Sequence, residues 1–312
     1  MNMDAVFEGG GMKAIGLVGA ACCLQDKGYN IKNFAGSSAG AIVAALLAAG
    51  YSGRELKDII MNLNYNEFLD NNKLKKIRPL MFAKNFITLF KDKGVYSGDP
   101  IEKYIGELLE AKGKTKFKDL SVEGKSYLKV IISDITKGDM LIAPDDLIKY
   151  DIDPMEFEIA KVVRMSISMP FIFKPVKLSY KNEVSFIVDG GILSNYPIWV
   201  FDVNNKPRWP TFGMKLIEDK KTFTAGGKTD IISFTFDVIS AMINKNEEIY
   251  IKNKDWVRTI PIPTLNVGTT QINITKDLAN KLFESGYESA EKFLSKWNFN
   301  RYVADYRSKN II

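Results

Sequence analysis

The stretch that decides the fold is residues 31–49, which read IKNFAGSSAGAIVAALLAA. Its first five residues form a short, mainly apolar segment that is typical of a strand, and its alanine-rich end predicts a helix that stops at Gly50. The turn between them, GSSAG at residues 36–40, contains only small residues. A strand, a tight turn and a helix in this order are typical of an α/β protein with a parallel sheet.

A similar unit precedes this stretch. Residues 5–7 are a short apolar segment, Glu8 and a run of glycines follow, and residues 13–26 predict a helix that ends at Gly28. Two such units with short connections predict a mostly parallel central sheet flanked by helices. We expect a single domain over residues 1–312, with the motifs concentrated in 4–200 and residues 201–312 completing the same domain.

Composition and charge narrow the class of protein. Hydrophobic residues make up 46% and charged residues 26%, as in a globular protein, and the net charge of +6 suits an anionic partner, either a membrane surface or nucleic acid. The apolar runs 15–24 and 41–49 are about half as long as a membrane span. The first residues resemble no signal peptide, and the adjacent Cys22 and Cys23 cannot staple a fold. We therefore expect a soluble, cytoplasmic protein from a reducing compartment.

The chain contains no histidine. A Ser-His-Asp triad, a Cys-His pair and a histidine-ligated metal site are therefore excluded within this chain. Any hydrolytic chemistry must use a base other than imidazole.

Ser38 is the candidate nucleophile, because it is the central serine of a G-x-S-x-G pattern between a predicted strand and a predicted helix. In this context the turn exposes the hydroxyl group. Gly36 and Gly40 are needed because the strand and helix backbones pass close to each other. The alternative is a small-residue turn that only lets the helix pack against the strand.

The glycine run after the first strand is the candidate oxyanion hole. Backbone N–H groups of Gly9, Gly10, Gly11 and Met12 could converge on an anion there, and Lys13 either adds positive charge or anchors the loop.

The same run also matches the dinucleotide pattern G-x-G-x-x-A over residues 9–14. That pattern requires an acidic residue at the end of the next strand. The strand at 31–35 has no acidic residue and leads into the serine turn, so this alternative is disfavoured.

Asp189 is the candidate base. It follows a short apolar strand at 186–188 and precedes Gly190 and Gly191, which leave room for a serine to approach. Taken alone, an Asp-Gly pair is more often a turn. Together with the two glycine loops, and without histidine, Asp189 becomes the leading candidate for the general base.

These three segments resemble the patatin-like phospholipase family, which has a glycine-rich loop, a G-x-S-x-G turn and a distant D-G-G/A in this order. Residues 166–171 and 195–197 add to a similarity that covers about residues 4–200, with Ala14 as one departure where the family usually has glycine. The resemblance implies a three-layer α/β sandwich and a lipid acyl hydrolase of the phospholipase A or lysophospholipase type. It implies a dyad of Ser38 and Asp189. We expect no metal ion and no cofactor, because the sequence shows no cluster of residues that could bind a metal.

Residues 73–93 combine lysines with large apolar side chains, as interfacial segments do. The more common interpretation of such a segment is a helix that packs on the core with its lysines in solvent. The alternative is a contact with the inner face of a membrane, where the protein would bind peripherally. The residues of this candidate contact are Lys73, Lys75, Lys76, Phe82 and Phe86.

Three functions follow from these residues. The leading one is hydrolysis of phospholipids or other acyl lipids. The alternatives are a hydrolase of small soluble esters and a catalytically silent lipid-binding or interaction protein. Nucleic acid is not an expected partner, because the charge excess is small and no recognition motif is present. The sequence gives no oligomeric state.

Overall fold

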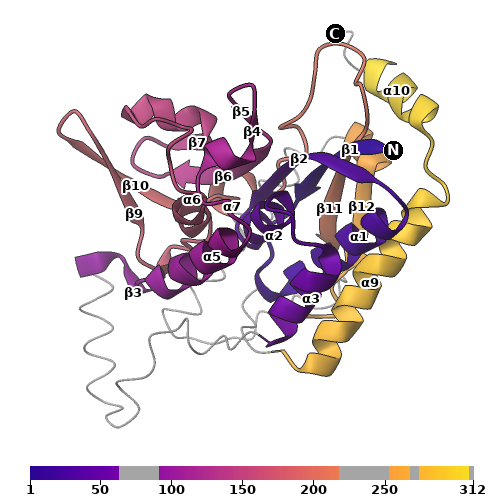
Figure 1. The fold of residues 1–312 in the computed structure, drawn as a ribbon, viewed down its shortest axis with the longest axis horizontal. Helices are drawn as coiled ribbons and strands as arrows, with labels where there is room; N and C mark the ends of the chain where they lie inside the picture. Colours follow the sequence, from indigo (N-terminus) through magenta and orange to yellow (C-terminus); the bar gives the residue numbers. More distant parts are fainter. Residues whose placement is uncertain (63–90, 218–252, 268–273, 309–312) are drawn as a thin grey trace.

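The computed structural model describes residues 1–62, 91–217, 253–267 and 274–308 (Figure 1). The described residues contain an eight-stranded sheet in the order β12-β11-β1-β2-β6-β10-β9, in which β7 also pairs with β6. Its strands are β1 (Asn2–Phe7), β2 (Asn30–Ser37), β6 (Leu128–Asp134), β7 (Asp139–Ala143), β9 (Val176–Tyr180), β10 (Glu183–Asp189), β11 (Thr211–Ile217) and β12 (Thr259–Pro263). The short strands β3 (Gly94–Tyr96) and β8 (Phe171–Phe173) pair with each other, as do β4 (Ser121–Val122) and β5 (Lys125–Ser126).

The sheet is parallel on one side and antiparallel on the other. From β12 through β11, β1 and β2 to β6, each strand runs parallel to its neighbour. β6 then pairs antiparallel with β7 and β10, and β10 pairs antiparallel with β9. The prediction of a mostly parallel central sheet is confirmed.

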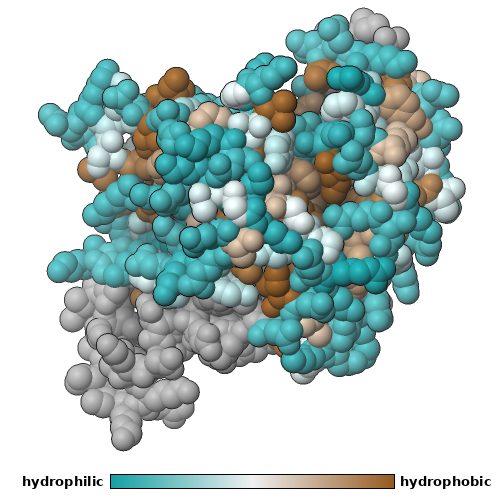
Figure 2. Space-filling model, viewed as in Figure 1, coloured by the Kyte–Doolittle hydropathy of each residue, from teal (hydrophilic) through white to brown (hydrophobic). Residues whose placement is uncertain are grey.

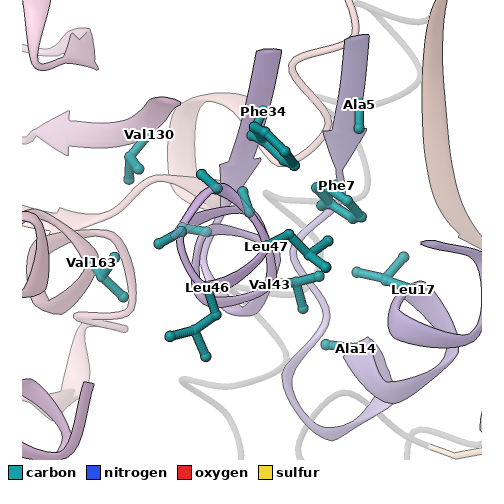
Figure 3. Packing of buried hydrophobic residues seen from close by; sticks show 14 of the residues in the cluster. Ala5, Phe7, Ala14, Leu17, Phe34, Val43, Leu46, Leu47, Val130 and Val163 are labelled. Atoms are coloured by element: carbon teal, nitrogen blue, oxygen red, sulfur yellow. The ribbon is translucent and has the colours of Figure 1, made fainter. Parts of the chain in front are cut away.

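Helices cover the sheet, and the two apolar runs of the sequence are among them (Figure 1). These runs form α1 and α2 and are almost completely buried, as the sequence predicts. Figure 3 shows α2 packed between the strands that carry Phe7 and Phe34 and the helices that carry Leu17 and Val163. The helices are α1 (Ala14–Asp26), α2 (Ala39–Ala48), α3 (Gly53–Asn62), α5 (Asp99–Ala111), α6 (Ile159–Ser166), α7 (Gly191–Ser194), α9 (Lys276–Leu294) and α10 (Phe299–Ser308).

The part of the chain after residue 200 extends the sheet. β11 pairs with β1, β12 pairs with β11, and α9 packs along α1. A separate small cluster of Val6, Ala35, Tyr196 and Ile198 forms where the segment after α7 covers strands β1 and β2. The single-domain organisation remains a prediction, which this pairing supports.

Most of the face seen in Figure 2 is hydrophilic where residues are described, with hydrophobic residues gathered in smaller areas. Within the described ranges, no helix is both long and apolar enough to cross a bilayer. The candidate membrane contact, with Lys73, Lys75, Lys76, Phe82 and Phe86, lies outside the described residues.

Candidate active site

Ser38 lies in a sharp turn between β2 and α2. Its backbone angles, φ 51° and ψ −129°, fall in a region that residues other than glycine rarely adopt. The flanking glycines make the turn possible: a Cβ atom at Gly36 would lie 2.3 Å from the carbonyl oxygen of Gly40, and one at Gly40 would lie 2.4 Å from that of Phe7. Both positions therefore require glycine, and the strained turn is the one expected of G-x-S-x-G.

Strand β6 brings the predicted nucleophile and the predicted base together. It lies between β2 and β10, where Ser37 pairs with Ile131 and Asp189 pairs with Ile132. At this point the Ser38 hydroxyl donates a hydrogen bond of 2.7 Å to Oδ2 of Asp189. Residues that are 151 positions apart in the sequence thus form one hydrogen-bonded pair.

The environment of Asp189 suits a base that acts near neutral pH. The residue is only 2% exposed, and burial raises the pKa of its carboxyl group to about 7. Hydrogen bonds from the Ser38 hydroxyl and from the Gly191 N–H, the latter 2.7 Å from Oδ1, oppose this increase. An ordinary aspartate, with a pKa of about 3.9, would be a much weaker base.

Ser166, at the end of α6, forms hydrogen bonds with Ser38 and with Gly190, the residue after Asp189. Its hydroxyl oxygen accepts a 2.9 Å hydrogen bond from the Ser38 N–H and donates one of 2.7 Å to the carbonyl oxygen of Ile131. Its backbone carbonyl accepts a 3.2 Å hydrogen bond from the Gly190 N–H. One completely buried serine therefore links the strained turn, strand β6 and the loop after Asp189.

The glycine loop offers N–H groups beside this pair. Within the described residues, the N–H groups of Gly10, Gly11 and Met12 have no acceptor, and Gly11 is exposed. The prediction that Gly9 also contributes a donor is wrong, because its N–H already donates to the carbonyl oxygen of Asn195 at 3.1 Å. Three of the four predicted donors are thus available to an anion.

Buried charged groups lie on either side of the loop. Glu8, immediately before the glycines, is 2% exposed, and its carboxylate forms an ion pair with Lys215 and accepts the N–H of Leu216. Lys13, after the glycines, is 4% exposed. The Glu8 ion pair fixes the start of the loop to β11, and neither Glu8 nor Lys215 was a predicted site residue.

Ser37, the neighbour of the candidate nucleophile, has a different environment. It is fully buried, and its hydroxyl oxygen has no hydrogen-bond partner in the described part of the chain. This agrees with the choice of Ser38 from the glycine spacing.

Ser166 and Asn195 had no predicted role, although both lie in segments with family resemblance. The sequence signal that could have identified them is their position: both are polar residues inside these segments, and Asn195 lies six residues after Asp189.

Curated proteins similar to this chain come from bacteria and viruses. The uncharacterized protein YqhO of Bacillus subtilis is 35% identical over 299 residues, which cover 96% of this chain and all of YqhO. The probable lipid hydrolase 463L of invertebrate iridescent virus 6 is 31% identical over 196 residues, which cover 62% of this chain and 61% of that protein.

Two solved structures share the fold. VipD from Legionella pneumophila superposes with a TM-score of 0.57 at 20% identity, over 94% of this chain and 66% of that chain. The type III effector protein ExoU, known from Pseudomonas aeruginosa, superposes with a TM-score of 0.53 at 15% identity, over 95% of this chain and 53% of that chain. The family model for patatin-like phospholipases matches residues 5–202. The strained serine turn, the glycine loop and this match lead to one conclusion: the chain belongs to the patatin-like phospholipase family.

Proposed function

We propose that this chain is a serine acyl hydrolase that cleaves ester bonds of phospholipids or other acyl lipids, with Ser38 as nucleophile and Asp189 as general base. The observation that carries this proposal is the 2.7 Å hydrogen bond between the two side chains in a chain without histidine. Membership in the patatin-like phospholipase family and similarity to a probable lipid hydrolase support acyl lipids as the substrate class.

The proposed reaction begins when Ser38 attacks the carbonyl carbon of the ester and its proton passes to the Asp189 carboxylate. The negative charge on the carbonyl oxygen is stabilised by the N–H groups of Gly10, Gly11 and Met12. The protonated Asp189 then donates its proton to the leaving alcohol, which leaves an acyl-Ser38 enzyme. A water molecule that Asp189 deprotonates attacks this intermediate, and the fatty acid and the free serine form.

The pKa of about 7 makes one aspartate suitable for both proton transfers. At neutral pH the carboxyl group is divided between its charged and neutral forms, so it can accept a proton from Ser38 and return it to the leaving group. We propose that the substrate lies at a membrane surface, because a lipase must reach an ester below the lipid headgroups and the net charge of +6 favours an anionic surface.

The test is hydrolysis of a panel of phospholipids, lysophospholipids and short-chain soluble esters by wild type, Ser38→Ala and Ser37→Ala. We expect wild type and Ser37→Ala to release fatty acid from at least one lipid class and Ser38→Ala to be inactive with an unchanged melting temperature. Hydrolysis of short soluble esters alone would contradict the proposed substrate. Equal activity of wild type and Ser38→Ala would contradict the proposed nucleophile.

A further inference from the structure

Asn195 makes an unusual pair of contacts with the glycine loop. It directly follows α7, the short helix after Asp189, and is 8% exposed. Its backbone carbonyl accepts the N–H of Gly9 at 3.1 Å, and its side-chain Nδ2 donates to the carbonyl oxygen of Gly9 at 3.2 Å. Both backbone polar groups of Gly9 are therefore held by a single residue that is 186 positions away.

The second contact controls where a neighbouring N–H group points. The carbonyl oxygen of Gly9 and the N–H of Gly10 belong to the same peptide unit, and in a planar trans peptide they point in opposite directions. Fixing the Gly9 oxygen toward Asn195 therefore directs the Gly10 N–H away from it. That N–H is one of the three in the glycine loop without an acceptor among the described residues.

The Asn195 amide is packed tightly against the glycine loop and the segment after Asp189. A Cβ atom at Gly9 would lie 2.2 Å from Oδ1 of Asn195 and 2.9 Å from Cβ of Ser38. A Cβ atom at Gly191 would lie 2.7 Å from the same Oδ1. The side chain thus has little room to turn, and it contacts both the glycine loop and the loop that carries Asp189.

We propose that Asn195 is a positioning residue that orients the Gly9–Gly10 peptide, so that the Gly10 N–H is presented to the oxyanion that forms at Ser38. This inference rests on the proposed function. Because Asn195 also follows the loop of Asp189, it fixes the oxyanion donors relative to the general base. Its contribution belongs to the transition state, since a ground-state ester carbonyl carries little charge.

The expected loss of kcat can be worked out from the effect of removing an oxyanion donor. Removing one oxyanion donor lowers kcat by about 10²- to 10³-fold. Asn195→Ala leaves the Gly10 N–H in place but frees its peptide to rotate, so we expect kcat to fall by about 10- to 100-fold. KM for a short-chain soluble ester should change by less than about threefold, because binding of the uncharged ester does not depend on this donor.

The experiment uses the full chain with Asn195→Ala, Asn195→Asp and the control Asn33→Ala. Asn195→Asp keeps the size of the side chain, but it replaces the Nδ2 donor to Gly9 with a carboxylate oxygen and adds a negative charge. Asn33→Ala removes another hydrogen bond donated by an asparagine side chain, from Nδ2 of Asn33 to Oδ1 of Asp4 at 2.6 Å. Asp4 lies in β1 and Asn33 in β2, and each precedes the loop of the candidate site that follows its own strand. Each variant is assayed with a short-chain ester and with a trifluoromethyl ketone, which forms a tetrahedral oxyanion on the serine. A fluorophosphonate that has reacted to completion with Ser38 gives the fraction of each protein that has a folded active site.

We expect both Asn195 variants to lose affinity for the trifluoromethyl ketone in parallel with kcat/KM, at full labelling stoichiometry, while Asn33→Ala keeps wild-type kinetics. A kcat within about threefold of wild type in both Asn195 variants would overturn the inference. So would a loss of kcat with unchanged affinity for the ketone, which would indicate a merely structural role. A wild-type enzyme whose activity does not depend on Ser38 would overturn the proposed function instead.

Discussion

Replacing Asp189 with asparagine should make the free energy of unfolding less sensitive to pH. The Asp189 carboxyl group is 2% exposed and has a pKa of about 7, against about 3.9 for an unperturbed aspartate. Between these two values the unfolded chain has released the proton and the folded chain has retained it. Stability from this group is therefore complete below about pH 4 and is lost as the pH rises through 7. Asparagine keeps the shape of the side chain and does not titrate.

The size of the effect follows from the two pKa values. Each unit of pKa difference corresponds to about 1.4 kcal/mol, so the full difference between acid and alkaline conditions is about 4 kcal/mol. Only part of this range is accessible to a folded protein. Between pH 5 and pH 8, integration predicts that wild type loses about 2–3 kcal/mol of stability relative to Asp189→Asn.

The assay is urea unfolding of both proteins at pH 5, 6, 7 and 8, followed by the fluorescence of the four tryptophans. Taking the difference between the two proteins at each pH cancels the titration of all other groups. We expect this difference to grow with pH and to level off above pH 7. A difference that stays constant from pH 5 to pH 8 would refute the argument that burial raises the Asp189 pKa.

Three further predictions concern catalysis and membrane binding. The pH profile of kcat/KM should rise with an apparent pKa near 7, because Asp189 must be deprotonated to accept the Ser38 proton; a profile that is flat from pH 5 to pH 8 would contradict this. Ser166→Ala should lower kcat by about 10-fold or more without raising KM, since it removes the acceptor of the Ser38 N–H. Unchanged kinetics would show that the Ser38 turn keeps its conformation without the Ser166 hydroxyl. Replacing Lys73, Lys75 and Lys76 with glutamine should weaken sedimentation with anionic vesicles by up to about 1 kcal/mol per lysine at low salt, and leave hydrolysis of soluble esters intact. Equal sedimentation of wild type and the triple variant would contradict a role for this segment.

Local patterns predicted much of the sheet. The strand at 31–35, the GSSAG turn and the following helix are all present as β2, the Ser38 turn and α2, because each depends on residues that are adjacent in the sequence. The buried helices α1 and α2 followed from runs of apolar residues that are too short for a membrane. The parallel sheet followed from two strand–helix units in succession.

The contacts that hold the candidate site together could not be predicted in this way. Gly9 was expected to offer its N–H, and only the folded chain shows that Asn195 already accepts it. Glu8 pairs with Lys215, which is 207 positions away, and Ser166 reaches Ser38 across 128 positions. No local pattern encodes such distances, which depend on the order of strands in the sheet.

The most direct test of the account is to map the residue that a fluorophosphonate modifies. Trypsin releases residues 33–54 as one peptide, which contains Ser37, Ser38 and Ser52, so fragmentation by mass spectrometry distinguishes the three serines. We predict one label per chain on Ser38 in wild type, no label on this peptide in Ser38→Ala, and much slower labelling in Asp189→Asn. A label on Ser37 or Ser52, or undiminished labelling of Ser38→Ala, would contradict the assignment of Ser38 as the nucleophile.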